Sequence, residues 1–285
     1  MRILILLAGW AVAAAPVLIE GVPDVRQKAD FCGEACVAMY LQKLGHDVDQ
    51  DFVFDQSGLD ATHARGCYSK KLKLALARIG FETGAGWATV RSANAKKELE
   101  AEFAAMLRDL QADVPSIVCM HYDDSPNTTE HFCLILGYDK ATEELIYHEP
   151  AEDDAAYQRM PKARFLSLWP LKYKADAWTV IRFPLRAGQI RARPSKARYS
   201  DADFGQHLMQ LKTRTPAGFT ATLEKPFVVV GDIGAAAVQR RAEGTVRWVV
   251  EQVKHFYFEK DPNEIIDIWL FRDRASYEKH CWDLF

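Results

Sequence analysis

A cysteine stands where the sequence predicts the start of an apolar helix. Cys32 is followed by Gly33, and apolar residues then recur at helical spacing until Gly45. A thiol attacks only as the thiolate, and the unpaired N–H groups and positive end of a helix N-terminus stabilise that anion. Cys32 is therefore the candidate nucleophile for attack on a carbonyl carbon. Cys36 lies one turn later and is expected to face the core.

A glutamine precedes this cysteine by five residues. The side-chain N–H of Gln27 and the backbone N–H of Cys32 are suited to hold the oxyanion that forms when a carbonyl is attacked. Gly33 leaves room for the backbone of a substrate. A lone cysteine at a helix start is also typical of an inert buried residue, so the sequence leaves both roles open.

A cysteine nucleophile needs a base, and His131 is the best placed of the eight histidines. It stands at the start of an apolar run that ends at Tyr138, which is expected to be a central strand that holds the ring rigidly. Other histidines are expected on loops or solvated faces: His46, His63, His255 and His280.

The acceptor that orients the imidazole is expected to be Glu149. The polar segment 139–144 predicts a hairpin turn between two strands, which brings Glu149 opposite or diagonal to His131. A register shift of one residue would bring His148 to that face instead. A solvated acidic loop that continues through Asp154 is the alternative environment for Glu149.

No metal site and no cofactor are expected. The segment 148–152 lacks the second histidine of an HExxH motif, and Pro150 would break the helix that this motif requires. The three-residue gap between Cys32 and Cys36 is not the gap of common zinc or redox motifs. The segment 231–234 lacks the lysine and the third glycine of phosphate-binding loops.

Helices come first along the chain and strands follow them. Helical spacing predicts helices over 32–44, 72–79 and 99–110, and short apolar runs predict strands over 116–120, 132–138, 145–147 and 178–183. This order predicts an α+β fold in which the N-terminal helices pack on an antiparallel sheet.

Four segments make up the predicted domain organisation. Residues 1–15 have the layout of a signal peptide, because Arg2 precedes an apolar stretch and a run of small residues. The main α+β domain is expected over 16–185, and the arginine-rich stretch 186–200 with its glycine and proline is expected to be a linker. Residues 201–285 are expected to form a small α+β domain.

This C-terminal block has its own pattern of elements. It contains a predicted strand over 227–230, a long helix over 235–258, a strand over 265–271 and a helix from Ser276. The sequence stops at Phe285 with no polar tail, which is typical of a domain that is incomplete or that packs its terminus tightly.

Composition and charge limit the partners. Lys plus Arg total 36 against 39 Asp plus Glu, so the chain lacks the basic excess of nucleic-acid-binding proteins. No apolar run reaches the length of about 18 to 20 residues that spans a bilayer, so no stable membrane span is expected after signal removal. The signal predicts a secreted or periplasmic protein of the cell envelope. The six cysteines leave open a disulfide in that compartment.

The candidate residues and their surroundings resemble the bacteriocin-processing, double-glycine type papain-like cysteine peptidases, the peptidase family thirty-nine. The resemblance covers Val22 to Phe183. It rests on these residues: Gln27, the helix start Cys32-Gly33-x-Ala35-Cys36 with Met39, His131-Phe132 with Gly137-Tyr138-Asp139, and Pro150. It implies a papain-like fold in which Cys32 is the nucleophile and His131 the base, with Gln27 as the upstream glutamine.

The sequence departs from that family at two points. Glu149 stands where the family has an Asp or Asn before proline, and the spacing from glutamine to cysteine is five where six is usual in related enzymes. The segment from Pro226 to Leu270 is weakly similar to the opening portion of gluzincin-like metallopeptidase domains.

The resulting expectation is a cysteine-dependent hydrolase, a peptidase or amidase, that acts on a peptide or protein through an acyl-enzyme intermediate. Cys32 attacks, His131 transfers the proton, Glu149 orients the imidazole and Gln27 helps to bind the oxyanion. Two alternatives stay open: a catalytically silent papain-like module that binds peptides, and a transglutaminase-like acyl transferase.

Overall fold

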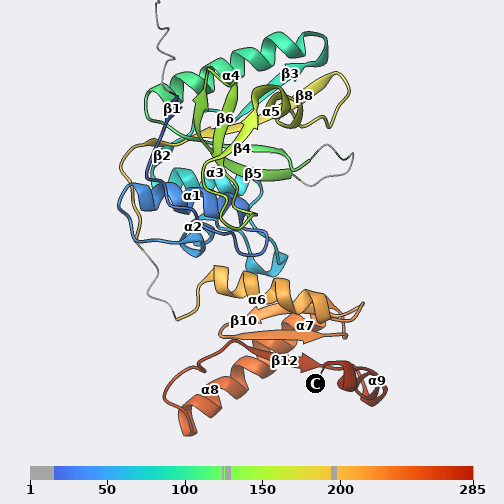
Figure 1. The fold of residues 1–285 in the computed structure, drawn as a ribbon. Helices are drawn as coiled ribbons and strands as arrows, with labels where there is room; N and C mark the ends of the chain where they lie inside the picture. Colours follow the sequence, from blue (N-terminus) through green and yellow to red (C-terminus); the bar gives the residue numbers. More distant parts are fainter. Residues whose placement is uncertain (1–15, 124, 126–129, 194–197, 285) are drawn as a thin grey trace, which may run out of the picture. The chain divides into compact units, whose positions relative to one another are not determined.

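The computed structural model of the chain describes residues 16–284 except 124, 126–129 and 194–197 (Figure 1). The predicted signal peptide, residues 1–15, lies outside the described residues. The chain divides into two compact units, each discontinuous in sequence. Unit 1 holds the described residues of Met1–Gln27, Ala35–Val48 and Leu76–Ala192, and unit 2 holds those of Lys28–Glu34, Asp49–Ala75 and Arg193–Phe285.

An antiparallel sheet forms the centre of unit 1. Its strands follow the order β3-β8-β4-β5-β6-β7, with β1 paired to β5. Their bounds are β1 (Val17–Leu18), β3 (Trp87–Arg91), β4 (Ser116–His121), β5 (Glu130–Asp139), β6 (Glu144–His148), β7 (Gln158–Pro161) and β8 (Ala177–Pro184). Every pairing between these described strands is antiparallel, which confirms the predicted α+β class.

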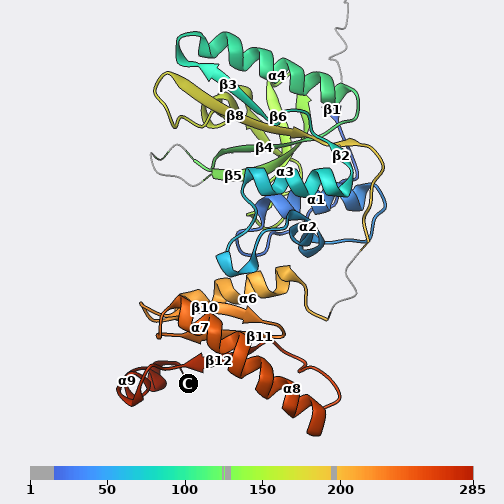
Figure 2. The same cartoon turned by 180° about the vertical axis from the view of Figure 1, so that it is seen from behind.

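Helices pack on this sheet because their apolar residues recur every three or four positions. In α4 (Ala95–Gln111) the residues Leu99, Phe103 and Met106 are buried, and the helix contacts β1, β3, β4 and β5 (Figure 2). Other elements of unit 1 are α1 (Cys32–Lys43) from Ala35 onward, η2 (Ser92–Asn94), α5 (Lys162–Leu168), and the two-stranded ladder of β2 (Phe81–Glu82) and β9 (Arg186–Ala187). The first residues of the predicted linker therefore lie in a strand.

The hairpin of β5 and β6 forms as the sequence predicts. A β-bulge lies between Ile135 and Gly137, so the pairing changes by one residue along the hairpin. Gly137 is required here, because a Cβ atom would lie 2.5 Å from the carbonyl oxygen of Val17 in β1. The turn is closed by Asp139, whose Oδ1 accepts the N–H of Ala141 at 3.0 Å.

Unit 2 contains a small mixed sheet covered by helices. Strand β11 pairs antiparallel with β10 and parallel with β12. A cluster that includes Phe204, Leu208 and Leu211 of α6 packs against Val228 and Val230 of β11. The elements are α2 (Gln50–Ser57), η1 (Ala61–His63), α3 (Ser69–Ile79), which continues into unit 1, α6 (Asp201–Arg214), β10 (Thr220–Glu224), β11 (Phe227–Gly231), α7 (Ala235–Arg241), η3 (Ala242–Val246), α8 (Arg247–Phe256), β12 (Ile266–Leu270) and α9 (Arg274–Leu284).

The long helix predicted over 235–258 is present as three consecutive helical segments. An α-helical stretch, α7, leads into a π-helical turn, η3, and then into α8. Among the described residues, no helix has both the length and the hydropathy of a membrane span.

Candidate active site

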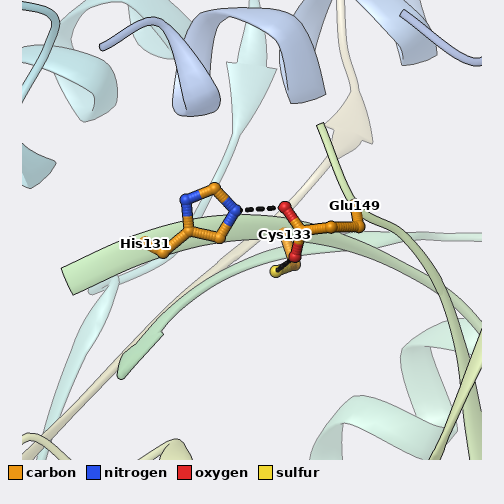
Figure 3. A group of neighbouring side chains, drawn as sticks. All are labelled: His131, Cys133 and Glu149. Atoms are coloured by element: carbon orange, nitrogen blue, oxygen red, sulfur yellow. Dashed lines mark hydrogen bonds and ion pairs between the residues drawn. The ribbon is translucent and has the colours of Figure 1, made fainter. Parts of the chain in front are cut away.

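His131 and Glu149 form a buried hydrogen-bonded pair in unit 1 (Figure 3). Nε2 of His131 is bonded to Oε1 of Glu149, and each residue is only 7% exposed. His131 is the second residue of β5, and Glu149 follows directly after β6. A carboxylate on one ring nitrogen fixes both the tautomer and the orientation of an imidazole. The pair therefore has the arrangement of a general base and its orienting acid.

The register of the hairpin explains why Glu149 reaches His131. Leu134 pairs with His148, so the next position places Glu149 opposite Cys133 and diagonal to His131. His148, the alternative that the sequence left open, is fully buried and lies edge-on against Tyr157, with ring centroids 4.6 Å apart. Burial lowers the pKa of His148.

The electrostatics of Glu149 favour its charged form. Burial opposes ionisation most strongly, but the hydrogen bond and the charge of His131, with two further donors, lower the pKa of Glu149 below its ordinary value. The N–H of Ala151 donates to Oε1 at 3.0 Å, and the thiol of Cys133 donates to Oε2 at 3.2 Å. Both oxygens of the carboxylate are therefore held by donors in the fold.

Two further contacts define the surroundings of this pair. The ring of Tyr122 meets the His131 ring edge-on, with centroids 5.3 Å apart and planes at 88°. The backbone N–H of Gln27 donates to the carbonyl of Pro150 at 2.9 Å, which ties Gln27 to the residue after Glu149. The side-chain Oε1 of Gln27 is buried without a hydrogen-bond partner among the described residues.

The helix that begins at Cys32 packs against the strand that carries His131. Cys36, one turn after Cys32 and fully buried, donates its thiol to the carbonyl oxygen of Phe132 at 3.7 Å. This position fits the core role expected for Cys36. All six cysteines are free thiols in the structure.

Cys32 is the first residue of α1 and is half-buried. Its position is set within unit 2 by the two residues before it. Asp30 has the left-handed φ of 58°, and its Oδ2 accepts the N–H of Gly66 at 2.8 Å. Phe31 is fully buried and stacks on Phe54 with ring centroids 4.9 Å apart. The chain therefore enters the helix in one fixed direction.

Glu34 is a buried carboxyl group two residues after Cys32. Its Oε1 accepts the N–H of Cys67 at 2.8 Å, and its Oε2 is buried without a partner among the described residues. Burial raises the pKa of Glu34 to about 7, against the lowering effect of the Cys67 N–H. Burial and the nearby Glu34 also raise the pKa of the Cys67 thiol.

The predicted site residues fall into the two units as follows. Gln27, His131 and Glu149 belong to unit 1 and Cys32 to unit 2. Within unit 1 the structure brings His131 and Glu149 into direct contact, and their catalytic roles stay a prediction. Cys133 was not among the predicted site residues, although its position two residues after His131 on a strand places both side chains on one face.

Comparisons with known proteins give the following matches. The sequence model of the Peptidase_C39 like family matches residues 19–176, more than half of the chain. The solved peptidase domain of Streptococcus ComA, titled a bi-functional ABC transporter involved in a quorum sensing pathway, is 17% identical. That match covers 58% of this chain and 99% of that chain, with a TM-score of 0.36. A structure of EndoMS in its apo form is 9% identical, over 70% of this chain and 96% of that chain, with a TM-score of 0.13.

No curated protein matches the chain. At such identities and TM-scores, the two structural likenesses assign no function to it.

Proposed function

Because the chain belongs to the Peptidase_C39 like family, we propose that it is a hydrolase that cleaves peptide bonds, or related amides, through Cys32, His131 and Glu149. The family supports a cysteine peptidase kind of function and a peptide as the class of substrate. The observation that supports the assignment of the catalytic residues is the buried hydrogen bond between His131 and Glu149. A base of this kind needs a third group that fixes its ring.

The first half of the reaction forms an acyl-enzyme. Glu149 holds Nε2 of the imidazole, so Nδ1 of His131 takes the proton of the Cys32 thiol. The thiolate attacks the carbonyl carbon, and the oxyanion accepts hydrogen bonds from the Cys32 N–H and the Gln27 side chain. The carbon–nitrogen bond then breaks, the amine leaves with the proton from His131, and a thioester remains on Cys32.

The second half releases the acyl group to water. Nδ1 of His131 takes a proton from a water molecule, which attacks the thioester carbonyl. The carbon–sulfur bond breaks, the carboxylic acid leaves, and the proton returns to Cys32. Throughout both halves Glu149 keeps the ring in one orientation and stabilises the imidazolium that forms after each proton transfer.

Two features of the chain support the role of Cys32. It occupies the first helical position of α1, where unpaired backbone N–H groups and the helix dipole stabilise a thiolate. It is also half-buried, unlike Cys36, which is 0% exposed and faces the core.

The test is cleavage of a mixed-sequence peptide library, followed by mass spectrometry. The wild-type protein and the control Cys281→Ser should both cleave peptides, while Cys32→Ala should not. A short digestion stopped in acid should show an acyl adduct on the peptide that contains Cys32. Cleavage by Cys32→Ala would overturn the proposal, and intact Cys32 thiol with no cleavage of any peptide would favour a silent binding module.

Acyl transfer is separated from hydrolysis in the same assay. Adding a primary amine should leave the free acid as the main product of a hydrolase. Amide products that replace the acid would instead assign the chain to acyl transferases, which use the same nucleophile and base.

We also propose export to the periplasm or the cell exterior, supported by the layout of residues 1–15. The N-terminal residue of the protein, recovered from a cell that expresses the full chain, tests this. Loss of a segment that ends near Ala15 is expected. An intact Met1 on protein from the cytosolic fraction would contradict export.

A further inference from the structure

Three different metal-binding side chains converge in unit 1, and the proposed hydrolysis uses only two of them. One ligand atom each from His131, Cys133 and Glu149 lies within 4.8 Å of the other two. All three residues are buried, with Cys133 at 0% exposure. The Glu149 carboxylate joins the other two, with Oε1 on the imidazole and Oε2 on the thiol (Figure 3).

The fold holds these side chains together before any ion binds. His131 and Cys133 are alternate residues of β5 and so share one face of the strand, while Glu149, directly after β6, comes opposite Cys133 because Leu134 pairs with His148. Ala151 fixes the carboxylate with a backbone hydrogen bond. The ligands come from two segments of the chain, with Cys133 and Glu149 16 positions apart.

We propose that His131, Cys133 and Glu149 bind a divalent transition-metal ion of the zinc class, with water as the fourth ligand. Binding releases the thiol proton of Cys133, and the thiolate, the carboxylate and the neutral imidazole then bind the ion. Two negative ligand charges balance the ion, so the buried site remains neutral overall. A thiolate and an imidazole select zinc over magnesium or calcium, which prefer oxygen ligands.

The distances fit this proposal after small side-chain movements. Zinc binds nitrogen and sulfur at about 2.0 to 2.3 Å, so a tetrahedral site separates its ligand atoms by about 3.3 to 3.8 Å. The present upper separation of 4.8 Å therefore has to close by about 1 Å, while the imidazole and the carboxylate have to part to admit the ion.

Metal binding would switch off the proposed peptidase, and this part rests on the proposed function. Coordination through Nε2 leaves the only ring N–H on Nδ1, so His131 can no longer take the proton of Cys32. Glu149 would also be committed to the ion. The bound metal and catalysis therefore exclude each other.

Cobalt(II) titration of the Cys32→Ala protein tests the site without activity. Thiolate ligation gives a charge-transfer band in the near ultraviolet, and one equivalent of Co²⁺ should saturate it. Adding Cys133→Ser should abolish the band and weaken Zn²⁺ binding in calorimetry by about tenfold or more. Cys119→Ser changes another buried cysteine, on the neighbouring strand β4, and should leave both unchanged.

Thermal melting without metal shows whether the Cys133→Ser variant folds. If it does not fold, Glu149→Gln in the Cys32→Ala background gives a second test. It should also weaken Zn²⁺ binding by about tenfold or more. Absence of the band in Cys32→Ala, or its persistence with Cys133→Ser, would overturn the site. If the band is present but Zn²⁺ leaves the cleavage of peptides by the wild-type protein unchanged, the metal site is confirmed and inhibition of the peptidase by the metal is refuted.

Discussion

Replacing Glu34 by glutamine should change how the stability of the protein depends on pH. Glu34 is fully buried two residues after Cys32, and burial raises its pKa from 4.5 to about 7. The fold therefore favours the protonated carboxyl group. The stability that this group contributes is fully present below pH 4.5 and is lost as the pH rises through about 7.

The size of the effect follows from the two pKa values. One pKa unit corresponds to about 1.4 kcal/mol, so the rise from 4.5 to about 7 amounts to about 3 kcal/mol in the free energy of unfolding. The amide of Glu34→Gln adds buried N–H donors, whose cost of about 1 to 3 kcal/mol is independent of pH. The free energy of unfolding of the mutant minus that of the wild type is therefore compared at pH 4.5 and pH 8.5, and its change between the two isolates the contribution of the carboxyl group.

Urea unfolding at a series of pH values measures this difference. Glu34→Gln should gain about 3 kcal/mol relative to the wild type between pH 4.5 and pH 8.5. Glu251→Gln, at an exposed position of α8, serves as the control and should show no comparable change. A Glu34→Gln difference that is constant over this range would refute the assignment of a buried carboxyl group with a raised pKa.

Three further predictions concern the site and its support. Gly66→Ala should lower the free energy of unfolding by about 1 to 3 kcal/mol, because the added Cβ would lie 1.7 Å from the backbone oxygen of Asp30. The control Gly244→Ala, whose Cβ would have no atom within 4 Å, should not lower it, and equal urea midpoints for the two variants would contradict the prediction. Glu149→Gln should lower kcat/KM for peptide cleavage about 10- to 100-fold, since a buried hydrogen bond to a charged group contributes about 1.5 to 3 kcal/mol. Unchanged kinetics would show that Glu149 does not orient the imidazole for catalysis. Iodoacetamide should label the partly exposed Cys32 and Cys281 before the buried cysteines, which are Cys36, Cys67, Cys119 and Cys133. Peptide mass spectra that show a buried cysteine labelled first would disprove this.

Helices and strands with a clear pattern of apolar residues could be predicted from the sequence. The helix α4 carries Leu99, Phe103 and Met106 on one buried face, and β5 is an apolar run of strand length. Short or half-exposed elements escaped, such as α2, which has eight residues, and β3, whose residues are mostly partly exposed. The helix α6 was also missed, although Ser200 and Asp203 form a capping box that marks its start.

The contact between His131 and Glu149 depends on one residue of register. Leu134 pairs with His148 before the bulge, and Gly137 pairs with Ile146 after it. Without the bulge, Glu149 would lie opposite Leu134 and point to the other face. The sequence contains Gly137 but does not indicate that the bulge falls there, so it left His148 and Glu149 as alternatives.

The composition of unit 2 depends on contacts that no local pattern indicates. The helix α6 contacts η1 and α2, which lie far away in sequence. A hydrogen bond from Ala202 to Asp55 joins residues 147 positions apart. Pairings of this kind arise from packing of the folded chain, and periodicity within one segment carries no information about them.

The rate at which iodoacetamide alkylates Cys32 reports whether an imidazole activates the thiol. The comparison uses the Cys281→Ser background at neutral pH, with His131→Ala as the test and His63→Ala, an exposed histidine, as the control. We expect His131→Ala to slow alkylation about tenfold or more and His63→Ala to leave the rate unchanged. Equal rates in all three proteins would contradict this expectation.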